Sequence, residues 1–312
     1  MRKPLKPPAL VPGSIVHVVS PASPAKQARV ERGCQNLEHL SLRVQRNAAN
    51  HEPDGYFAAT LPARLAELQN AIADPDSRAI FCTRGGYGSA ALLDGLKISR
   101  SARPKIFCGS SDLTSLHIFL WQTHRWITFY GPLVAGGFDA GPNATSGYDP
   151  DSFERAMSVT RGGWTLPLRG ETLVRGTAAG TLLGGCVTLL ETSIGTPWEL
   201  DTRGSILLLE DRSVKPYQLD RMLLHLVQAG KFKGVRGIVL GEFPESEPPE
   251  GSDVNVSDVC KRVLGPLRVP IVYGAPIGHT PRPILTVPLG VQARLRATGE
   301  GRLEILEPAV RA

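Results

Sequence analysis

IFCGSSDLT, residues Ile106–Thr114, joins a short apolar run to a helical pattern through one glycine and two serines. A strand that passes through a tight turn directly into a helix is the repeating unit of a parallel α/β sheet. Such a turn also lifts a serine hydroxyl out of the sheet, so this serine is a candidate nucleophile. Alternatively, Ser110 or Ser111 only caps the helix, as serines commonly do. This segment alone favours the cap, because it lacks the full Gly-x-Ser-x-Gly pattern.

The same alternation of strand and helix extends through the first half of the chain. Apolar runs typical of buried strands alternate with amphipathic helical patterns, which predicts a parallel sheet covered on both faces. The predicted strands are Ser14–Ser20, Leu42–Arg46, Ala79–Thr83, Lys105–Gly109 and Ile127–Tyr130, and the predicted helices are Ala25–Leu40, Leu61–Ala73 and Leu113–Gln122.

The pattern changes in the second half. Turn-forming residues dominate from about Val134 to Leu168, where only Asp151–Val159 has a helical pattern. Beyond them, short β runs and one clear helix predict a mixed α/β, β-rich domain. The predicted elements are strands Gly204–Leu209, Gly237–Leu240, Val269–Tyr273, Ile284–Val287 and Val291–Arg296, and helix Pro216–Ala229. We therefore expect a first domain over residues 1–135, a linker over 136–168 and a C-terminal domain over 169–312.

Length and composition agree with a soluble protein of about two domains, since the chain has 312 residues, 42% of them hydrophobic. The five cysteines are scattered without a CxxC pair, which indicates a reducing, cytoplasmic compartment and no structural zinc site. The net charge of +6 is spread along the chain and aromatics make up 6%, so no nucleic-acid-binding strip is expected. No secretory leader and no membrane-spanning run are expected either.

A glycine-rich segment, TRGGYG (Thr83–Gly88), follows the third predicted strand. Its glycines allow a sharp turn that presents N–H groups to a ligand. The segment lacks the Lys-Ser/Thr of a P-loop and the spacing of a dinucleotide fingerprint, yet it could still cradle a phosphate. Because the carboxyl ends of parallel strands meet at one edge of a sheet, we expect this turn to lie near Ser111.

Glu210 and His279 are the candidate partners of a nucleophilic serine. Glu210 ends the apolar run Ile206–Leu209, and His279 lies in the loop GAPIGHTP (Gly274–Pro281), a setting that the other six histidines lack. A serine nucleophile needs a base, and the base needs an acid to orient it. Equally, Glu210 could be a solvated strand end and His279 an ordinary loop residue.

Four segments together resemble the LD-carboxypeptidase family of serine peptidases, which includes murein tetrapeptide carboxypeptidases and microcin-resistance peptidases. They are IFCTRGGYGSAALL (Ile80–Leu93), GSSDLTSLH (Gly109–His117), LLLEDRSVKPYQLDRML (Leu207–Leu223) and GAPIGHTPRPILTVPLG (Gly274–Gly290). Weaker similarity covers Leu10–Pro24 and Gly180–Pro197, so the resemblance spans nearly the whole chain in the family's order. It implies a Rossmann-like N-terminal domain and a smaller C-terminal domain, with the cleft between them.

The resemblance also implies the roles of individual residues. It makes Ser111 the nucleophile, Glu210 the acid and His279 the base. Oxyanion donors would come from the backbone of Asp112 and of Gly86. The substrate would be a short peptide with an L-to-D bond before a terminal D-residue, and neither a metal nor an organic cofactor is required.

Substrate binding is assigned less directly. A terminal carboxylate could pair with Arg84 or Arg212, although either could be a plain surface arginine, and Gly85 is expected beside the substrate. The chain departs from the family at Cys186, where asparagine is frequent, and at Arg212–Lys215, where a glycine and acidic residues are frequent. Both departures leave the three catalytic residues in place but bear on substrate identity.

Three other functions remain open. The runner-up is a microcin-type resistance peptidase, which cleaves an acyl-aminoacyl-nucleotide or a related amide. A catalytically idle relative could use the glycine turn only to bind a phosphate or carboxylate. A cysteine-dependent hydrolase could use Cys108, which lies near the serines. A homodimer is possible in each case.

Overall fold

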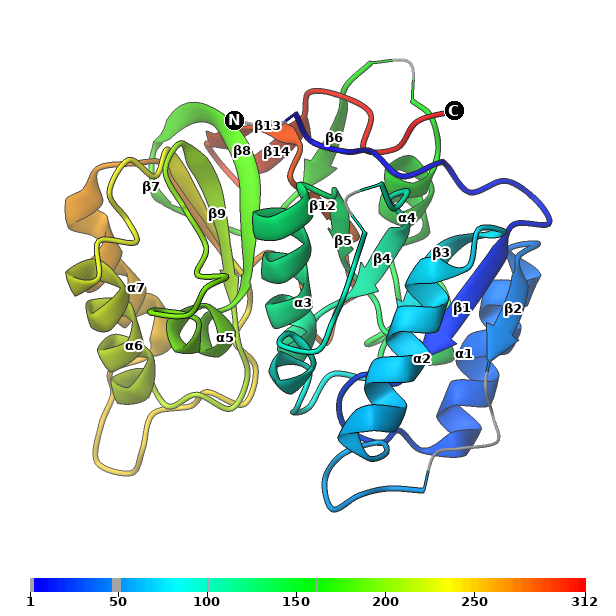
Figure 1. The fold of residues 1–312 in the computed structure, drawn as a ribbon. Coiled ribbons are helices and arrows are strands. Elements are labelled where there is room, and N and C mark those ends of the chain that lie inside the picture. Colours follow the sequence, from blue (N-terminus) through cyan, green and yellow to red (C-terminus); the bar gives the residue numbers. More distant parts are fainter. Residues whose placement is uncertain (1–2, 47–51, 100, 161) are drawn as a thin grey trace.

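The protein, described by a computed structural model over residues 3–46, 52–99, 101–160 and 162–312, contains two β-sheets lying side by side (Figure 1). The first sheet consists of β1 (Ile15–Val19), β2 (Arg43–Arg46), β3 (Ser77–Cys82), β4 (Ile106–Gly109), β5 (Thr128–Tyr130) and β12 (Val287–Leu289). Its strand order is β12-β5-β4-β3-β1-β2, parallel except for β12. The predicted α/β class is therefore confirmed.

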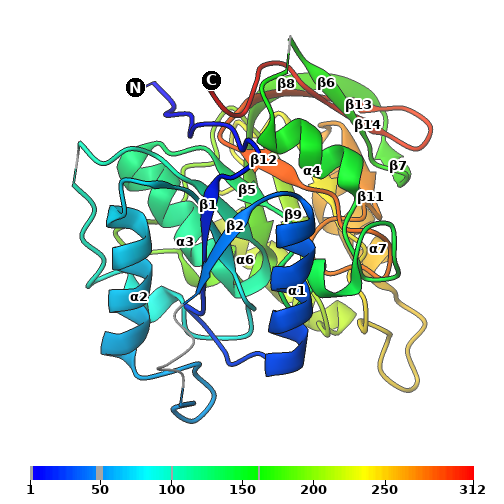
Figure 2. The same cartoon turned by 90° about the vertical axis from the view of Figure 1, so that its right-hand side faces the viewer.

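Helices cover both faces of the first sheet, and the end of β3 shows why its central strands carry continuous apolar runs. Helices α1 (Gln27–His39) and α2 (Leu61–Ala73) lie on opposite sides of the sheet (Figure 2). Phe81 packs in the same buried cluster as α1, whereas Ile80 packs in the cluster that contains α2. Successive residues of a strand point to opposite faces, so a strand covered on both sides must be apolar at every position.

The second sheet is mixed, with eight strands. They are β6 (Trp164–Pro167), β7 (Glu171–Val174), β8 (Gly176–Cys186), β9 (Ser205–Glu210), β10 (Gly237–Leu240), β11 (Ile271–Tyr273), β13 (Gln292–Ala297) and β14 (Arg302–Ile305). Strands β8 to β11 are parallel neighbours in chain order, and antiparallel strands extend the sheet on both sides. Helices α5 (Val187–Thr192), α6 (Pro216–Gln228) and α7 (Val256–Leu264) accompany it.

The structure differs from the sequence expectation in several elements. The region 136–168 holds the short helix η4 (Phe138–Ala140), α4 (Pro150–Met157) and strand β6. The expected strand Ile284–Val287 is wrong, because the strand is β12 and it pairs with β5 in the first sheet. The chain therefore returns to the first sheet after His279, and the proposed division into residues 1–135, 136–168 and 169–312 stays a prediction.

The two sheets share one hydrophobic core. Phe81 and Phe129 of the first sheet belong to the same buried cluster as Ile206 and Leu208 of the second. On its other face the second sheet packs Leu207 and its neighbours against α6 and α7. No helix in the described part of the chain is both long and apolar enough to cross a bilayer.

A buried arginine fastens the loops at the carboxyl edge of the first sheet. Arg64 of α2 is 1% exposed, and its guanidinium donates to the carbonyl oxygens of Ala59 (3.0 Å), Pro21 (2.7 Å) and Gly88 (2.9 Å). It also lies 4.6 Å from the centre of the Phe57 ring. Because Gly88 belongs to the glycine-rich turn, Arg64 holds that turn from behind.

We expect Arg64→Ala to lower the free energy of unfolding by about 2–4 kcal/mol, since it leaves buried carbonyls without donors and opens a cavity. Urea unfolding followed by circular dichroism measures this change. Arg203→Ala is the matched control, because Arg203 forms an exposed ion pair with Asp201 and its loss should leave stability close to wild type. Equal stability of the two variants would show that the hydrogen bonds of Arg64 do not stabilise these loops.

Candidate active site

The turn after β4 holds Ser111 in a strained conformation. Ser111 opens the short helix η2 (Ser111–Leu113), which continues into α3 (Thr114–Phe119), as the strand-turn-helix reading predicts. Its φ is +64°, in the left-handed region that residues other than glycine rarely adopt. Ser110 is extended, and its side chain makes no capping hydrogen bond. Strain of this kind is typical of a nucleophile turn rather than of a simple helix cap.

The turn is held from both sides. The Ser111 N–H donates to the Tyr130 hydroxyl at 2.9 Å, and the Thr114 hydroxyl donates to the Ser111 carbonyl at 2.7 Å. These hydrogen bonds hold the backbone of Ser111 in place. A strained conformation persists only where the surrounding structure fixes it in this way.

Asp112 ties this turn to the glycine-rich turn after β3. Its carboxylate accepts hydrogen bonds from the N–H groups of Gly88 (3.3 Å) and Ser89 (2.8 Å), and its carbonyl accepts one from the Ser89 hydroxyl (2.7 Å). The two turns, which follow neighbouring strands, therefore form one rigid unit.

Glycine is required where the two turns touch. A Cβ on Gly85 would lie 2.9 Å from the Cβ of Ser111 and 3.3 Å from the backbone nitrogen of Asp112. Gly86 has φ +97°, and a Cβ there would collide with Ser23. The Asp112 N–H belongs to the first turn of a helix, where amides lack helical partners. The glycine-rich turn thus lies against Ser111 and the Asp112 amide, and the oxyanion roles of Gly86 and Asp112 stay a prediction.

Glu210 and His279 form a buried pair in the second half of the chain. The Glu210 Oε2 accepts hydrogen bonds from the His279 Nδ1 at 2.7 Å and from its backbone N–H at 2.9 Å, and the side chain of Glu210 is fully buried. A Cβ on Gly278 would lie 2.4 Å from the Glu210 carboxyl carbon, so only glycine fits there. With Nδ1 donating to the carboxylate, Nε2 is left to accept a proton.

The pair shifts the pKa of both members. Burial alone would raise the pKa of Glu210, but the charge and hydrogen bonds of His279, together with the Tyr130 hydroxyl, lower it. Burial alone would lower the pKa of His279, but the charge and hydrogen bond of Glu210 raise it. The carboxylate is therefore ionised, and the imidazole is a stronger base than an ordinary histidine.

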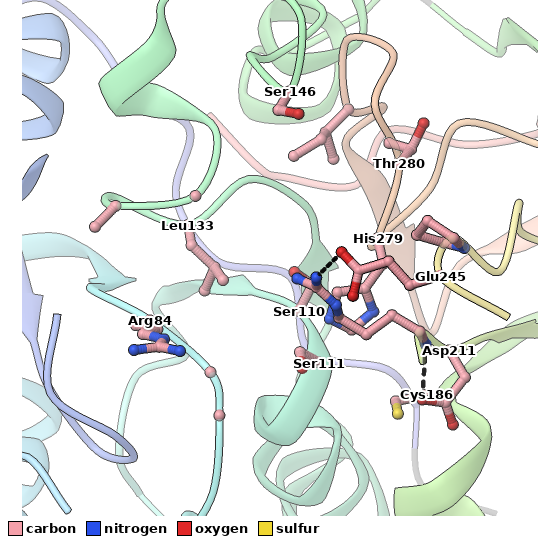
Figure 3. Close-up of a pocket in the computed structure, with 18 of the residues that line it drawn as sticks. Arg84, Ser110, Ser111, Leu133, Ser146, Cys186, Asp211, Glu245, His279 and Thr280 are labelled. Atoms are coloured by element: carbon pink, nitrogen blue, oxygen red, sulfur yellow. Dashed lines mark hydrogen bonds and ion pairs between the residues drawn. The ribbon is translucent and has the colours of Figure 1, made fainter. Parts of the chain in front are cut away.

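A cavity of about 740 Å³ brings these parts together (Figure 3). Ser111 and His279 both line it, whereas Glu210 lies behind His279, away from the cavity wall. In the described structure no hydrogen bond joins the Ser111 hydroxyl to the imidazole, and such contacts often tighten only when substrate binds. The cavity thus places a candidate nucleophile and a candidate base in one chamber.

The predicted substrate-binding residues Arg84, Gly85 and Arg212 also line this cavity, as does Gly86, the predicted oxyanion donor. Arg84 and Arg212 differ in the charge of the groups that they contact. Arg84 donates to the neutral carbonyl of Pro24 at 3.0 Å, whereas Arg212 is paired with the carboxylate of Glu245. Arg84 is therefore the better partner for a substrate carboxylate.

Two further residues of the site, Tyr130 and Asp211, were not singled out from the sequence. Tyr130 contacts both Ser111 and Glu210, and its signal was its place at the end of the strand beside β4. Asp211, a buried residue of the cavity wall, accepts hydrogen bonds from Thr188 (N–H 2.9 Å, hydroxyl 2.7 Å). Burial and then the charge of Glu210 raise the pKa of Asp211.

The cysteines do not fit the role of nucleophile. Burial raises the pKa of the Cys108 thiol far above its usual range, and its sulfur lies beside the Pro132 carbonyl rather than on the cavity wall. Cys186 does line the cavity, but burial and the charge of Asp211 raise its pKa well above the ordinary value. A thiol needs its anion to attack, so the cysteine-dependent alternative is not supported.

Comparison with known proteins agrees with this geometry. Residues 16–131 match the LD-carboxypeptidase N-terminal domain, and residues 179–295 match the LD-carboxypeptidase C-terminal domain. A Bacillus subtilis relative called "Probable murein peptide carboxypeptidase" is 34% identical, with 93% of this chain and 91% of the relative covered. The murein tetrapeptide carboxypeptidase of Pseudomonas aeruginosa is 31% identical, with coverage of 85% and 87%.

Solved structures give the same result. The microcin C7 self-immunity protein MccF superimposes with a TM-score of 0.89 at 26% identity, covering 99% of this chain and 100% of its own. The muramoyltetrapeptide carboxypeptidase of Oxalobacter formigenes superimposes with a TM-score of 0.83 at 27% identity, with coverage of 95% and 99%. Both halves of the chain, its relatives and its fold thus lead to one conclusion: this chain belongs to the LD-carboxypeptidase family and is a serine peptidase of that type.

Proposed function

We propose that this protein is a serine carboxypeptidase that hydrolyses an L-to-D peptide bond before a terminal D-residue in short, muropeptide-like peptides. The observation that carries this proposal is the shared cavity. Strained Ser111 and the glycine-rich turn (Gly85 and Gly86) line the same chamber as His279, which is held by the buried carboxylate of Glu210.

The geometry supports a two-step acyl transfer. The Nε2 of His279 accepts the Ser111 proton as the serine oxygen attacks the scissile carbonyl, and Glu210 stabilises the resulting imidazolium. The N–H groups of Asp112 and Gly86 donate to the oxyanion. The imidazolium then gives its proton to the departing amine of the D-residue, and the acyl-enzyme forms. Water, deprotonated by His279, attacks the ester and releases Ser111.

Charges in the cavity favour a peptide with a free carboxylate. Lys26 and Arg84 line the wall beside the glycine-rich turn, and among the described residues Arg84 contacts the neutral carbonyl of Pro24 and pairs with no carboxylate. Arg84 is thus placed to bind the terminal carboxylate that distinguishes a carboxypeptidase substrate. Arg212 is engaged with Glu245 at the opposite wall, so it is the weaker candidate.

The second candidate is a microcin-type resistance peptidase. It is favoured by the likeness to MccF, a protein solved in complex with glutamyl sulfamoyl guanosine. However, none of the described residues that line the cavity is Phe, Tyr or Trp. A nucleoside base is often held by stacking on such a ring, and the only imidazole among the described lining residues, His279, is engaged with Glu210, so the peptide substrate is preferred.

Incubation with muropeptides and with aminoacyl sulfamoyl nucleotides, followed by mass spectrometry, separates the two candidates. Release of a terminal D-residue supports the carboxypeptidase. Hydrolysis of the aminoacyl amide to an amino acid and a sulfamoyl nucleoside supports the second candidate. An active-site serine probe identifies an idle relative, which it would leave unlabelled. The cytoplasmic location and the homodimer stay predictions, the first resting on five unpaired cysteines.

Ser111→Ala should abolish hydrolysis without loss of folding, because it removes only the attacking oxygen. Ser110→Ala is the matched control and should keep substantial activity, since Ser110 is extended and neither strained nor bonded as a cap. Initial rates on the same peptide and thermal unfolding of both variants check this. Activity that follows Ser110 would move the nucleophile by one position.

Glu210→Gln and His279→Ala should each lower kcat by about 10³-fold or more, since triad members act as a unit. The double variant should be scarcely slower than the slower single variant. The exposed pair of His225 and Glu191, joined at 2.6 Å, supplies matched controls in His225→Ala and Glu191→Gln. Losses that add strictly in log rate would show that Glu210 and His279 do not share a step.

The pH profile should report the raised pKa of His279. As the pH falls through this pKa, the imidazole gains a proton and can no longer accept one from Ser111. The midpoint of the acid limb of kcat/KM should therefore lie above ~6.5, the ordinary histidine value. The residual activity of Glu210→Gln should have its acid limb at lower pH. A rate that is flat from about pH 5 to about pH 8 would exclude a histidine base.

A further inference from the structure

Tyr130 is the last residue of β5 and is fully buried. It pairs in register with Gly109, at the end of the strand that leads to Ser111, and with Val287 of β12. It therefore stands between the nucleophile turn and the segment that returns from the His279 loop.

The hydroxyl of Tyr130 bridges the two halves of the site. It accepts a hydrogen bond from the Ser111 N–H at 2.9 Å and lies 2.5 Å from the Glu210 Oε1. A hydroxyl has one proton, and the carboxylate of Glu210 is ionised, so the Tyr130 proton points to Glu210. Burial and Glu210 also raise the pKa of Tyr130, which keeps that proton in place.

Each oxygen of the Glu210 carboxylate therefore has a different hydrogen-bond partner. Tyr130 donates to Oε1, whereas Oε2 receives both hydrogen bonds from His279. A carboxylate that is free to rotate could present either oxygen at a range of angles, but one that is bonded on both oxygens cannot. The orientation of the imidazole is thus fixed by a residue that does not touch it.

From these contacts we propose that Tyr130 is a positioning residue. Its hydroxyl fixes the position of the Ser111 backbone relative to the carboxylate of Glu210. This inference rests on the proposed catalytic roles of Ser111, Glu210 and His279, and it adds a fourth side chain to them. The aromatic ring fills the core, beside His117 at 5.6 Å, so the ring and the hydroxyl have separable roles.

Tyr130→Phe removes the hydroxyl and keeps the ring. We expect the rate at which a fluorophosphonate probe labels Ser111 to fall about 10- to 100-fold, as a small misplacement of a catalytic group does. In peptide hydrolysis the same loss should appear in kcat and not in KM. Tyr148→Phe is the matched control, because Tyr148 is buried in the same core against Phe138 and Phe153.

A second readout does not depend on turnover. Without the donor on Oε1, negative charge is concentrated on the oxygen that faces His279, so the imidazolium is stabilised. An NMR titration of the His279 ring, assigned with His279→Ala, should therefore show protonation at higher pH in Tyr130→Phe. Replacing Tyr130 by 3-fluorotyrosine, a stronger donor, should move it to lower pH.

Neighbouring charges do not change in these variants. The titratable and charged groups around the pair are Glu210, Asp211, Arg212 and Glu245 near His279, and Glu210, Cys186 and His117 near Tyr130. All remain in each variant, so a shift reports the hydroxyl itself.

The outcomes separate this proposal from the peptidase proposal. A labelling rate and a His279 titration that match those of Tyr148→Phe would overturn the role of Tyr130. A slower rate with an unmoved titration and a lowered Tm would also overturn it, since the hydroxyl would then only support the fold. If wild-type protein cleaves no peptide, the peptidase proposal fails, while the titration still decides the role of Tyr130.

Discussion

The fully buried carboxylate of Glu210 is the constraint on which the site depends. An ionised group cannot be taken out of water unless partners replace its hydration, and here two segments supply three hydrogen bonds. His279 contributes its ring and its backbone N–H from one loop, and Tyr130 contributes its hydroxyl from the first sheet. The two sheets must therefore meet at this point for the charge to be stable. Because the buried carboxylate of Glu210 needs hydrogen-bond donors, it holds His279 at the cavity that Ser111 also lines.

Close approach of backbones is the second requirement, and glycines meet it. The Glu210 side chain lies so near Gly241 and Gly278 that a Cβ on either would come within 2.5 Å of it. Gly85 plays the same part beside Ser111 on the other wall. The glycines are thus needed for space around the reacting groups, and not only for turning the chain. This explains why two glycine-containing loops far apart in sequence border the same cavity.

Local sequence predicted the first sheet well and the second less well. Strands β3 and β4 carry continuous apolar runs, Ala79–Cys82 and Ile106–Cys108, because helices cover both faces, and that pattern is visible without a structure. The long strand β8 was not predicted, because its sequence GTAAGTLLGGC is rich in glycine and poor in strand formers. Gly184 lies against the backbone of Leu208 and Gly185 against Thr114, so tertiary contacts, not propensity, make it a strand. Tyr130 was missed because its partner Glu210 is 80 residues away, so that its place at the end of a strand was the only local signal.

The two neighbouring acids, Glu210 and Asp211, show how one strand end separates two roles. Successive residues of a strand point to opposite faces, so only one of the two can reach the loop that carries His279. Glu210 faces that loop and Tyr130, and its pKa is lowered by their donors. Asp211 faces Thr188 at the start of α5, and burial raises its pKa. The surroundings thus favour a charged carboxylate at Glu210, which faces the imidazole, and disfavour one at Asp211. The sequence places the two carboxylates next to each other, and the direction in which each side chain leaves the strand end gives them different partners.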